Sequence, residues 1–280
     1  MQIGFLTAPF GGEPLENVVK FASGAGFDAL EVAADPGSSH IDPANLSAAD
    51  AKKIVKLVEG AGLRISSLAF YGNLTDPDPA AAEAAVAHVK KGIDACEKLG
   101  VEVMCAGAGL PHPGVSREEM LTKHTAKAYQ KLAPYAAKKG VKIGLENWFA
   151  TNIQNMPQWE LLFGLVPDAN FGLNFDPSHL YHQHIDYMGA VDQFAGRIFH
   201  SHAKDTEVNE WKKRWMGTLE GAWWRYVIPG FGGVDWGCYV SALRRNGLAD
   251  VTLSIEHEDS TFGREEGFVK GLNYLRTFVS

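Results

Sequence analysis

Four side chains that can bind a metal ion each end or follow a short apolar run. They are Glu146 in VKIGLE, Asp176 after FGLNF, His202 in RIFHSHA and Glu256 after VTLSI. If these runs are neighbouring parallel strands, their carboxyl ends meet at one edge and bring the four side chains together. Three carboxylates and one imidazole favour Mn²⁺, with Mg²⁺, Co²⁺ and Zn²⁺ as alternatives. The sequence therefore predicts one divalent metal site.

Electrostatics supports this interpretation for the four residues as a group. A single Glu or Asp at a strand end is more often a helix cap or a surface carboxylate, so none of them carries the prediction alone. Three carboxylates at the mouth of one barrel would repel one another strongly in a low-dielectric site unless a cation compensated them. The combination therefore favours a bound metal ion.

Short β-rich runs alternate with longer segments of helical periodicity, which is typical of βα units around a parallel sheet. Ser47, Asp78 and Ser116 have the residue types of helix N-caps. Three helical segments are followed by a glycine that can adopt the left-handed conformation and end the helix, at positions 62, 100 and 140. Eight such units predict a single (β/α)₈ TIM barrel domain over residues 1–280. The expected strands are 3–7, 29–33, 65–70, 101–105, 141–146, 171–176, 197–202 and 251–256.

The gap between the seventh and eighth expected strands is much longer than one helix needs. It contains Trp211, Trp215, Trp223, Trp224 and Trp236. Long βα loops build the sites of barrel enzymes, so we expect a Trp-rich loop insertion that covers or lines the pocket. An ordinary surface excursion is the alternative.

Other polar residues lie close to the four candidates in the sequence. His179 can reach the same pocket or cap the segment after Asp176. His200 should point into the barrel one layer below His202, as a supporting partner or a satisfied core histidine. His182 and His184 are expected to face solvent. Asp205 either caps the turn after its strand or orients His202.

Composition narrows the class of protein. A net charge of −7 disfavours a nucleic-acid binder, and no run approaches the length of a membrane span. The amino terminus lacks a secretory signal pattern, which predicts a cytoplasmic protein that acts on a small molecule. The three cysteines, at 96, 105 and 238, have no zinc or disulfide spacing and are expected to be buried. The oligomeric state is open, and a homo-oligomer is one option.

The ordered motifs resemble the sugar phosphate isomerase/epimerase superfamily of xylose-isomerase-like TIM barrels, along essentially the whole chain. They are LEN at Glu146, DPSH at Asp176, HSHAKD at His202, the segment WWRYVIPGFGGVDW from 223 to 236, and IEHED at Glu256. The superfamily includes ketose 3-epimerases, inosose dehydratases and isomerases, and apurinic endonucleases. The endonuclease branch has extra histidine ligands and a DxH motif that this chain lacks.

The resemblance implies that the four candidates bind one divalent ion and that Glu146 and Glu256 also form an acid/base pair. It further implies that His179 and Arg225 bind substrate oxygens, while Trp223 and Trp224 stack on a sugar ring. The expected activity is isomerisation or epimerisation of a ketose, keto-sugar or cyclitol through an enediolate. A lyase or dehydratase, which eliminates a β-substituent from a keto-sugar, a 3-keto-glycoside or an inosose, is the alternative.

Overall fold

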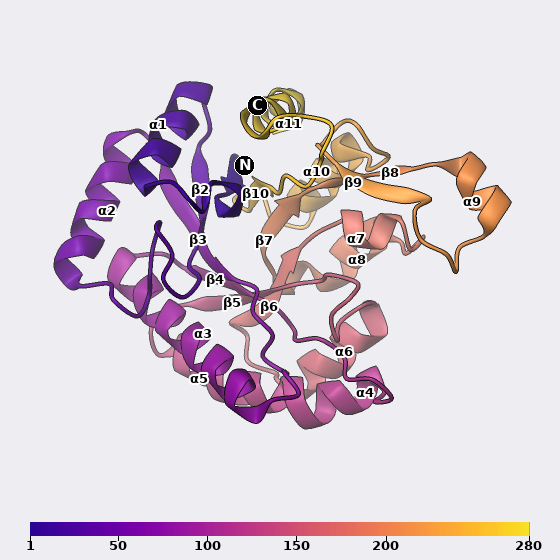
Figure 1. Cartoon of the computed structure of the whole chain (residues 1–280), viewed down its shortest axis with the longest axis horizontal. Coiled ribbons are helices and arrows are strands. Elements are labelled where there is room, and N and C mark those ends of the chain that lie inside the picture. Colours follow the sequence, from indigo (N-terminus) through magenta and orange to yellow (C-terminus); the bar gives the residue numbers. More distant parts are fainter. Residues whose placement is uncertain (280) are drawn as a thin grey trace.

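The computed structural model describes residues 1–279, in which eight parallel strands close into a barrel with helices around it (Figure 1). The predicted TIM barrel is therefore confirmed. Around the barrel the strands follow the order β1-β10-β7-β6-β5-β4-β3-β2. Their bounds are β1 Gln2–Leu6, β2 Ala29–Ala33, β3 Arg64–Phe70, β4 Val103–Ala106, β5 Lys142–Glu146, β6 Phe171–Phe175, β7 Ile198–Ala203 and β10 Thr252–Ile255.

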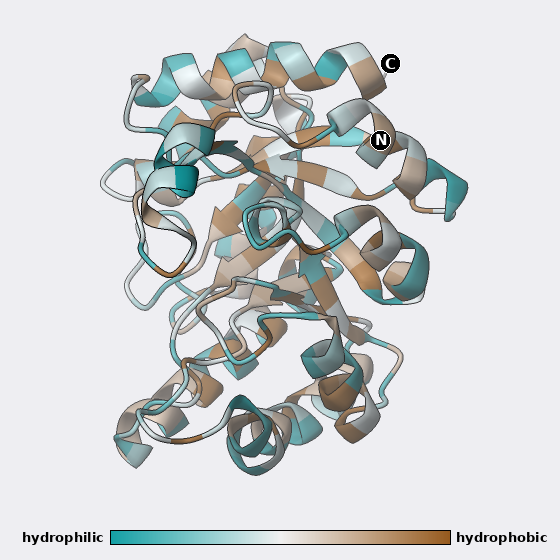
Figure 2. Ribbon diagram, turned by 90° about the vertical axis from the view of Figure 1, so that its right-hand side faces the viewer, coloured by the Kyte–Doolittle hydropathy of each residue, from teal (hydrophilic) through white to brown (hydrophobic). Residues whose placement is uncertain are grey.

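Helices cover the outside of the barrel. In Figure 2, hydrophobic stretches run through the central strands, whereas the helices carry both hydrophobic and hydrophilic stretches. No helix among residues 1–279 is long and apolar enough to cross a membrane. The helices are α1 Leu15–Ala25, α2 Ala48–Gly60, α3 Pro79–Leu99, α4 Arg117–Met120, α5 Ala126–Ala137, α6 Met156–Leu165, α7 Ser178–Tyr181, α8 Tyr187–Phe194, α9 Glu210–Met216, α10 Trp236–Arg245 and α11 Arg264–Val279.

Four strands, β4, β5, β7 and β10, begin one or two residues later than the sequence predicts. For β4 and β5 the cause lies in the helices before them. The amide of Val101 donates to the carbonyl of Cys96, and the amide of Val141 donates to that of Ala136. These bonds close the ends of α3 and α5 around left-handed glycines, including Gly100 at φ +69°. The first valine of these two expected strands therefore still belongs to the helix end.

The long gap after β7 forms an antiparallel hairpin and an ordinary barrel helix. Strands β8 (Asp205–Val208) and β9 (Trp224–Val227) pair with each other, and α9 lies between them. Figure 1 shows α9 projecting away from the barrel. Its Trp211 and Trp215 stack on each other and are 62% and 77% exposed. Trp236 instead lies in α10 and is fully buried, so the five tryptophans do not act as one surface.

A buried carboxylate ties the two ends of this excursion together. Asp205, at the start of β8, accepts hydrogen bonds from the amides of Gly230 and Val234 and from the indole of Trp236, each at 3.0 Å. No hydrogen bond joins Asp205 to His202 in the described residues. Of the two roles expected for Asp205, the structure supports the one that organises the following turn.

One expectation about the cysteines is wrong. Cys96 and Cys105 are buried, but Cys238 is exposed. Cys238 lies in the first turn of α10, whose opposite face buries Trp236 and Tyr239 against the barrel. Its position on the outer face of the helix explains the exposure.

Replacing Asp205 with Ala should lower the free energy of unfolding by on the order of 3 kcal/mol, because it leaves several buried N–H groups without an acceptor. Equilibrium urea unfolding measures this change. Asp192→Ala is the control, since Asp192 pairs with Arg245 and Asn246 at the exposed surface. Equal losses in the two variants would contradict the role given to Asp205.

Candidate active site

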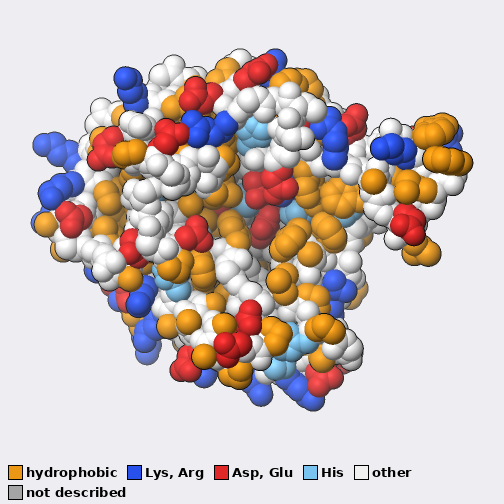
Figure 3. Space-filling model, in the orientation of Figure 1, with side chains coloured by type: hydrophobic (Ala, Val, Ile, Leu, Met, Phe, Trp, Pro, Cys, Tyr) orange, Lys and Arg blue, Asp and Glu red, His pale blue; other side chains and the backbone are white. Residues whose placement is uncertain are grey.

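The barrel brings the four predicted ligands together. Glu146 ends β5, Asp176 follows β6, His202 lies in β7 and Glu256 follows β10, and these strands are consecutive in the barrel. One ligand atom from each residue lies within 4.8 Å of all the others. Figure 3 shows acidic and histidine side chains at the bottom of a hollow in this face, bordered by hydrophobic side chains.

His202 lies at the centre of the group. Its Nδ1 atom is 3.1 Å from Glu256 Oε2, 3.3 Å from Glu146 Oε1 and 4.0 Å from Asp176 Oδ2. Asp176 and His202 are fully buried, and Glu146 and Glu256 retain only slight exposure. Water therefore screens these charges poorly, and other charges in the protein must balance them.

Lys204 supplies one balancing charge. Its Nζ lies 2.5 Å from Glu256 Oε2, 3.4 Å from Asp176 Oδ2 and 3.3 Å from Glu258 Oε1. The side chain is 1% exposed, and its ammonium lies over the ring of Tyr226. A buried lysine among carboxylates remains charged, because losing its proton would leave the carboxylates uncompensated.

The ionisation of the site follows from these contacts. Burial alone would raise the pKa of Glu256, but Lys204 and His202 lower it to about 2. Burial also opposes ionisation of Glu146, yet hydrogen bonds with His179 and His202 hold its pKa well below the usual range. Both glutamates are therefore carboxylates at neutral pH and can accept protons.

A divalent cation fits this donor set. Asp176 Oδ2 is buried and has no hydrogen-bond partner among the described residues. It faces the same space as His202 Nδ1 and the two glutamates. Lys204 Nζ and His179 Nε2 are its nearest polar neighbours, each 3.4 Å away. A buried carboxylate oxygen without a hydrogen bond is costly, and a metal ion would supply a closer contact. The chemistry of the donors thus agrees with the predicted metal site.

His179 lies in α7 and reaches the same pocket, which is one of the two roles expected for it. Its Nε2 is 3.1 Å from Glu146 Oε1 and 3.4 Å from Asp176 Oδ2, and its Nδ1 is 2.6 Å from the Tyr226 hydroxyl. Tyr226 belongs to β9, so the hairpin reaches the edge of the site. Contact with substrate remains a prediction for His179.

The other predicted substrate-binding residues lie farther out on the hairpin. Trp224 stacks on the imidazole of His182 with ring centroids 3.9 Å apart. Trp223 is buried and stacks on His184. Arg225 is paired with Glu207 at 2.6 Å and Asp259 at 2.8 Å.

The expectation that His182 faces solvent is therefore wrong. Its ring is covered by Trp224 on one face and meets Phe149 edge to face, so only 5% of the residue is exposed. His184 is exposed as expected.

Three polar residues of the site were not assigned from the sequence. Lys204 follows His202 by two positions, so strand alternation alone places both side chains on one face. Glu31 is the one acidic residue in the buried strand ALEVA, which marks it as exceptional. Tyr71 follows β3 without a distinctive pattern, and its hydroxyl reaches Glu31 at 2.7 Å.

A separate cavity opens at the other end of the barrel. It has a volume of about 520 Å³ and is lined by residues that include Arg64, Val101, Lys142 and Thr252. None of the four metal-ligand candidates lines it. The amino-terminal end of a TIM barrel is usually structural, whereas chemistry takes place at the carboxyl-terminal end.

Comparison with known proteins places the chain in a family. A model of the xylose isomerase-like TIM barrel family matches residues 19–278. The chain therefore belongs to this family, in agreement with the resemblance of its motifs.

Individual relatives are more distant. An inosose dehydratase of Glaesserella parasuis serovar 5 (strain SH0165) is 28% identical over 159 residues, which cover 54% of this chain and 53% of the dehydratase. The structure of the IolI protein with a bound zinc atom is 22% identical, with a TM-score of 0.78 over 100% of this chain and 98% of that one. D-psicose 3-epimerase from Clostridium cellulolyticum H10, solved with D-tagatose, is 18% identical, with a TM-score of 0.75 over 100% of both chains. At these identities the two structures show a shared fold.

Replacing Asp176 with Asn should weaken Mn²⁺ and Zn²⁺ binding by at least about tenfold, because the side chain loses its negative charge. Isothermal titration calorimetry measures the affinity. Asp250→Asn, at an exposed position outside the group, is the control. Unchanged affinity in Asp176→Asn would place the ion elsewhere.

Proposed function

We propose that the protein is a divalent-metal-dependent isomerase or epimerase of a ketose, keto-sugar or cyclitol. The observation that carries the proposal is the convergence of Glu146, Asp176, His202 and Glu256 at the carboxyl end of the barrel. The named relatives support the class of substrate, since they include an inosose dehydratase and a ketose 3-epimerase. Mn²⁺ is the first candidate for the metal, and Zn²⁺ is the alternative that the IolI structure supports.

Glu146 and Glu256 are the proposed acid/base pair. They come from the two outer strands of the four-strand arc, β5 and β10, and so approach the centre from two sides. One carboxylate removes the proton beside the substrate carbonyl. The other first takes up a proton from water and then delivers it to the opposite face. Return to the same carbon inverts it, whereas return to the neighbouring carbon moves the carbonyl.

The other residues hold the ion and the substrate. A divalent ion in this site would polarise the substrate's carbonyl and hydroxyl oxygens and so stabilise the enediolate charge. Asp176 and His202 serve only as ligands in this proposal. His179, Arg225, Trp223 and Trp224 are proposed to bind hydroxyl groups and the apolar face of the sugar, and the aromatic hairpin keeps water from the carbanion.

Glu146→Gln and Glu256→Gln should each lower turnover by about 10²–10⁴-fold, with a smaller effect on substrate binding. Glutamine keeps an oxygen for the metal but cannot accept a proton. The measurement is conversion of a ketose or inosose and deuterium uptake in D₂O, with each variant saturated with metal.

The control for these variants is Glu59→Gln, an exposed change on α2. Near-normal conversion and exchange in both active-site variants would show that the two carboxylates act only as ligands. His179 would then be the nearest alternative base.

A lyase or dehydratase is the second candidate, and Lys204 is the observation that favours it. In β-elimination, a base takes the proton beside the carbonyl, the electron pair forms a C=C bond, and the β-hydroxyl leaves. The leaving hydroxyl needs a proton, and the ammonium of Lys204 lies in the site beside Glu256 and Glu258. Donation of that proton releases water.

If elimination is the reaction, Lys204→Met should abolish loss of water from an inosose, or of the alcohol from a 3-keto-glycoside, while deuterium exchange continues. A screen of keto-sugars, inososes and 3-keto-glycosides with Mn²⁺ should record isomer and elimination products separately. Lys212→Met, on the exposed face of α9, is the control. If Lys204→Met loses both deuterium exchange and elimination, Lys204 balances the charge of the site and does not protonate the leaving group.

A further inference from the structure

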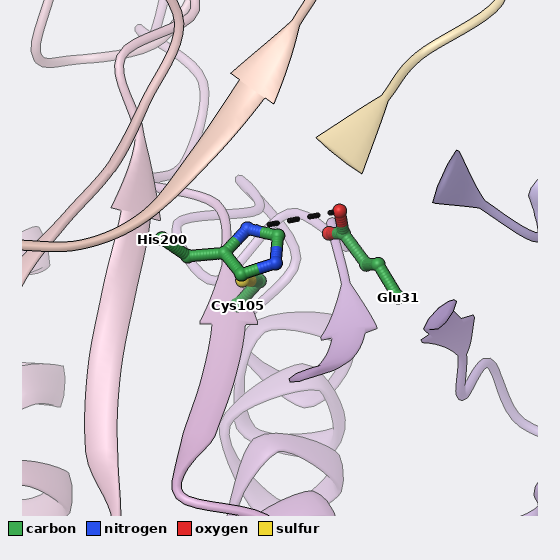
Figure 4. A group of neighbouring side chains, drawn as sticks. All are labelled: Glu31, Cys105 and His200. Carbon is green, nitrogen blue, oxygen red and sulfur yellow. Dashed lines mark ion pairs between the residues drawn. The ribbon is translucent and has the colours of Figure 1, made fainter. Parts of the chain in front are cut away.

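A second group of buried polar side chains lies inside the barrel, beside the metal-ligand candidates. Glu31 from β2, Cys105 from β4 and His200 from β7 point toward one another, and His200 Nδ1 lies 3.9 Å from Glu31 Oε2 (Figure 4). All three are at most 1% exposed. The cluster either holds a metal ion itself or supports the site beside it.

The hydrogen bonds of this cluster favour a supporting role. His200 Nδ1 lies 3.0 Å from Asn174 Oδ1, and its Nε2 lies 3.1 Å from Ser66 Oγ. Both ring nitrogens are therefore engaged, which leaves no free donor for a metal ion. His200 is the satisfied supporting histidine that its place in the sequence predicts.

Both carboxylate oxygens of Glu31 contact His202. They lie 3.1 and 3.2 Å from His202 Nε2, and Oε1 also accepts a hydrogen bond from the Tyr71 hydroxyl at 2.7 Å. Asn174 donates to the Tyr71 oxygen at 2.9 Å, which fixes the phenol in place. A carboxylate can only accept, so His202 Nε2 carries a proton. Nδ1 also faces carboxylates, those of Glu146 and Glu256, and so gives up its own proton only when a metal ion takes that place.

We propose that Glu31 is the positioning residue for His202, because its carboxylate fixes the imidazole tautomer that presents an unprotonated Nδ1 to the metal. Nδ1 is the atom that faces Glu146, Asp176 and Glu256. A carboxylate that holds the remote nitrogen of a ligating imidazole sets the ring's orientation and raises its basicity. This inference rests on the proposed metal site but not on the reaction that the site performs.

The first test measures Zn²⁺ affinity and stoichiometry by competition with a chromophoric chelator. Glu31→Gln should weaken binding about 10–100-fold, as is typical when a metal-bound histidine loses its carboxylate partner. Cys105→Ala is the matched control, because Cys105 neighbours Glu31 and makes no hydrogen bond to His202 among the described residues. We expect one ion per chain and an unchanged affinity in the control.

Two results would overturn the proposal. One is wild-type affinity in Glu31→Gln. The other is binding of two ions by the wild type, with one lost in Cys105→Ala, because Glu31 would then be a ligand of a second metal ion.

The second test needs no variant of Glu31 and remains informative if Glu31→Gln does not fold. Zinc-loaded wild-type protein labelled with ¹⁵N-histidine should show His202 coordinated through Nδ1 and protonated at Nε2. Loss of the signal in His202→Gln assigns it. Coordination through Nε2 would contradict the proposal.

Failure of the inference and failure of the proposed function are distinguishable. A wild-type protein that binds zinc through Nδ1 but converts no sugar contradicts the function and leaves the role of Glu31 intact. A wild-type protein that binds no divalent ion overturns both.

Discussion

The repulsion among buried carboxylates is the constraint on which the rest of this site depends. Glu146, Asp176 and Glu256 share a small, poorly hydrated space, and three negative charges at such distances are unstable without compensation. His202 and Lys204 provide part of that compensation within the chain. Asp176 Oδ2, which is buried and accepts no hydrogen bond among the described residues, marks where compensation remains incomplete, and this is the position that a divalent cation suits.

Support for the site comes from the layer of the barrel below it. Side chains there are usually apolar in a packed core, but this barrel places Glu31, Asn174 and His200 in its interior. Each is hydrogen-bonded, so the layer avoids the cost of unpaired buried polar groups. Rigid strands on all sides restrict the movement of these side chains, and an accurate metal geometry requires that restriction.

The parts of this structure that could be predicted from the sequence are those set by local pattern. Strand alternation and residue type were sufficient to find the eight strands and the four residues at their ends. The contact between Glu31 and His202 was not predictable, because β2 and β7 are not neighbours in the barrel and meet only across its interior. The burial of His182 likewise depends on Trp224, which reaches it only after the hairpin has folded back. Contacts between distant segments depend on the register and closure of the whole barrel.

The hydrogen bonds that Asp205 accepts hold the two ends of the excursion together, so the tip of the hairpin is set apart from the framework that holds the ligands. Residues 206–229 leave the barrel beside Asp205, and the chain rejoins it at Gly230, whose amide donates to the same carboxylate. The free-energy cost of closing a loop rises only slowly with its length, so a segment whose ends are held together tolerates insertion and deletion at its tip. The tip can therefore diverge between species or be exchanged in the laboratory while the strand that carries His202 keeps its register. If the hairpin binds substrate as proposed, substrate choice can change in this fold without altering the catalytic residues.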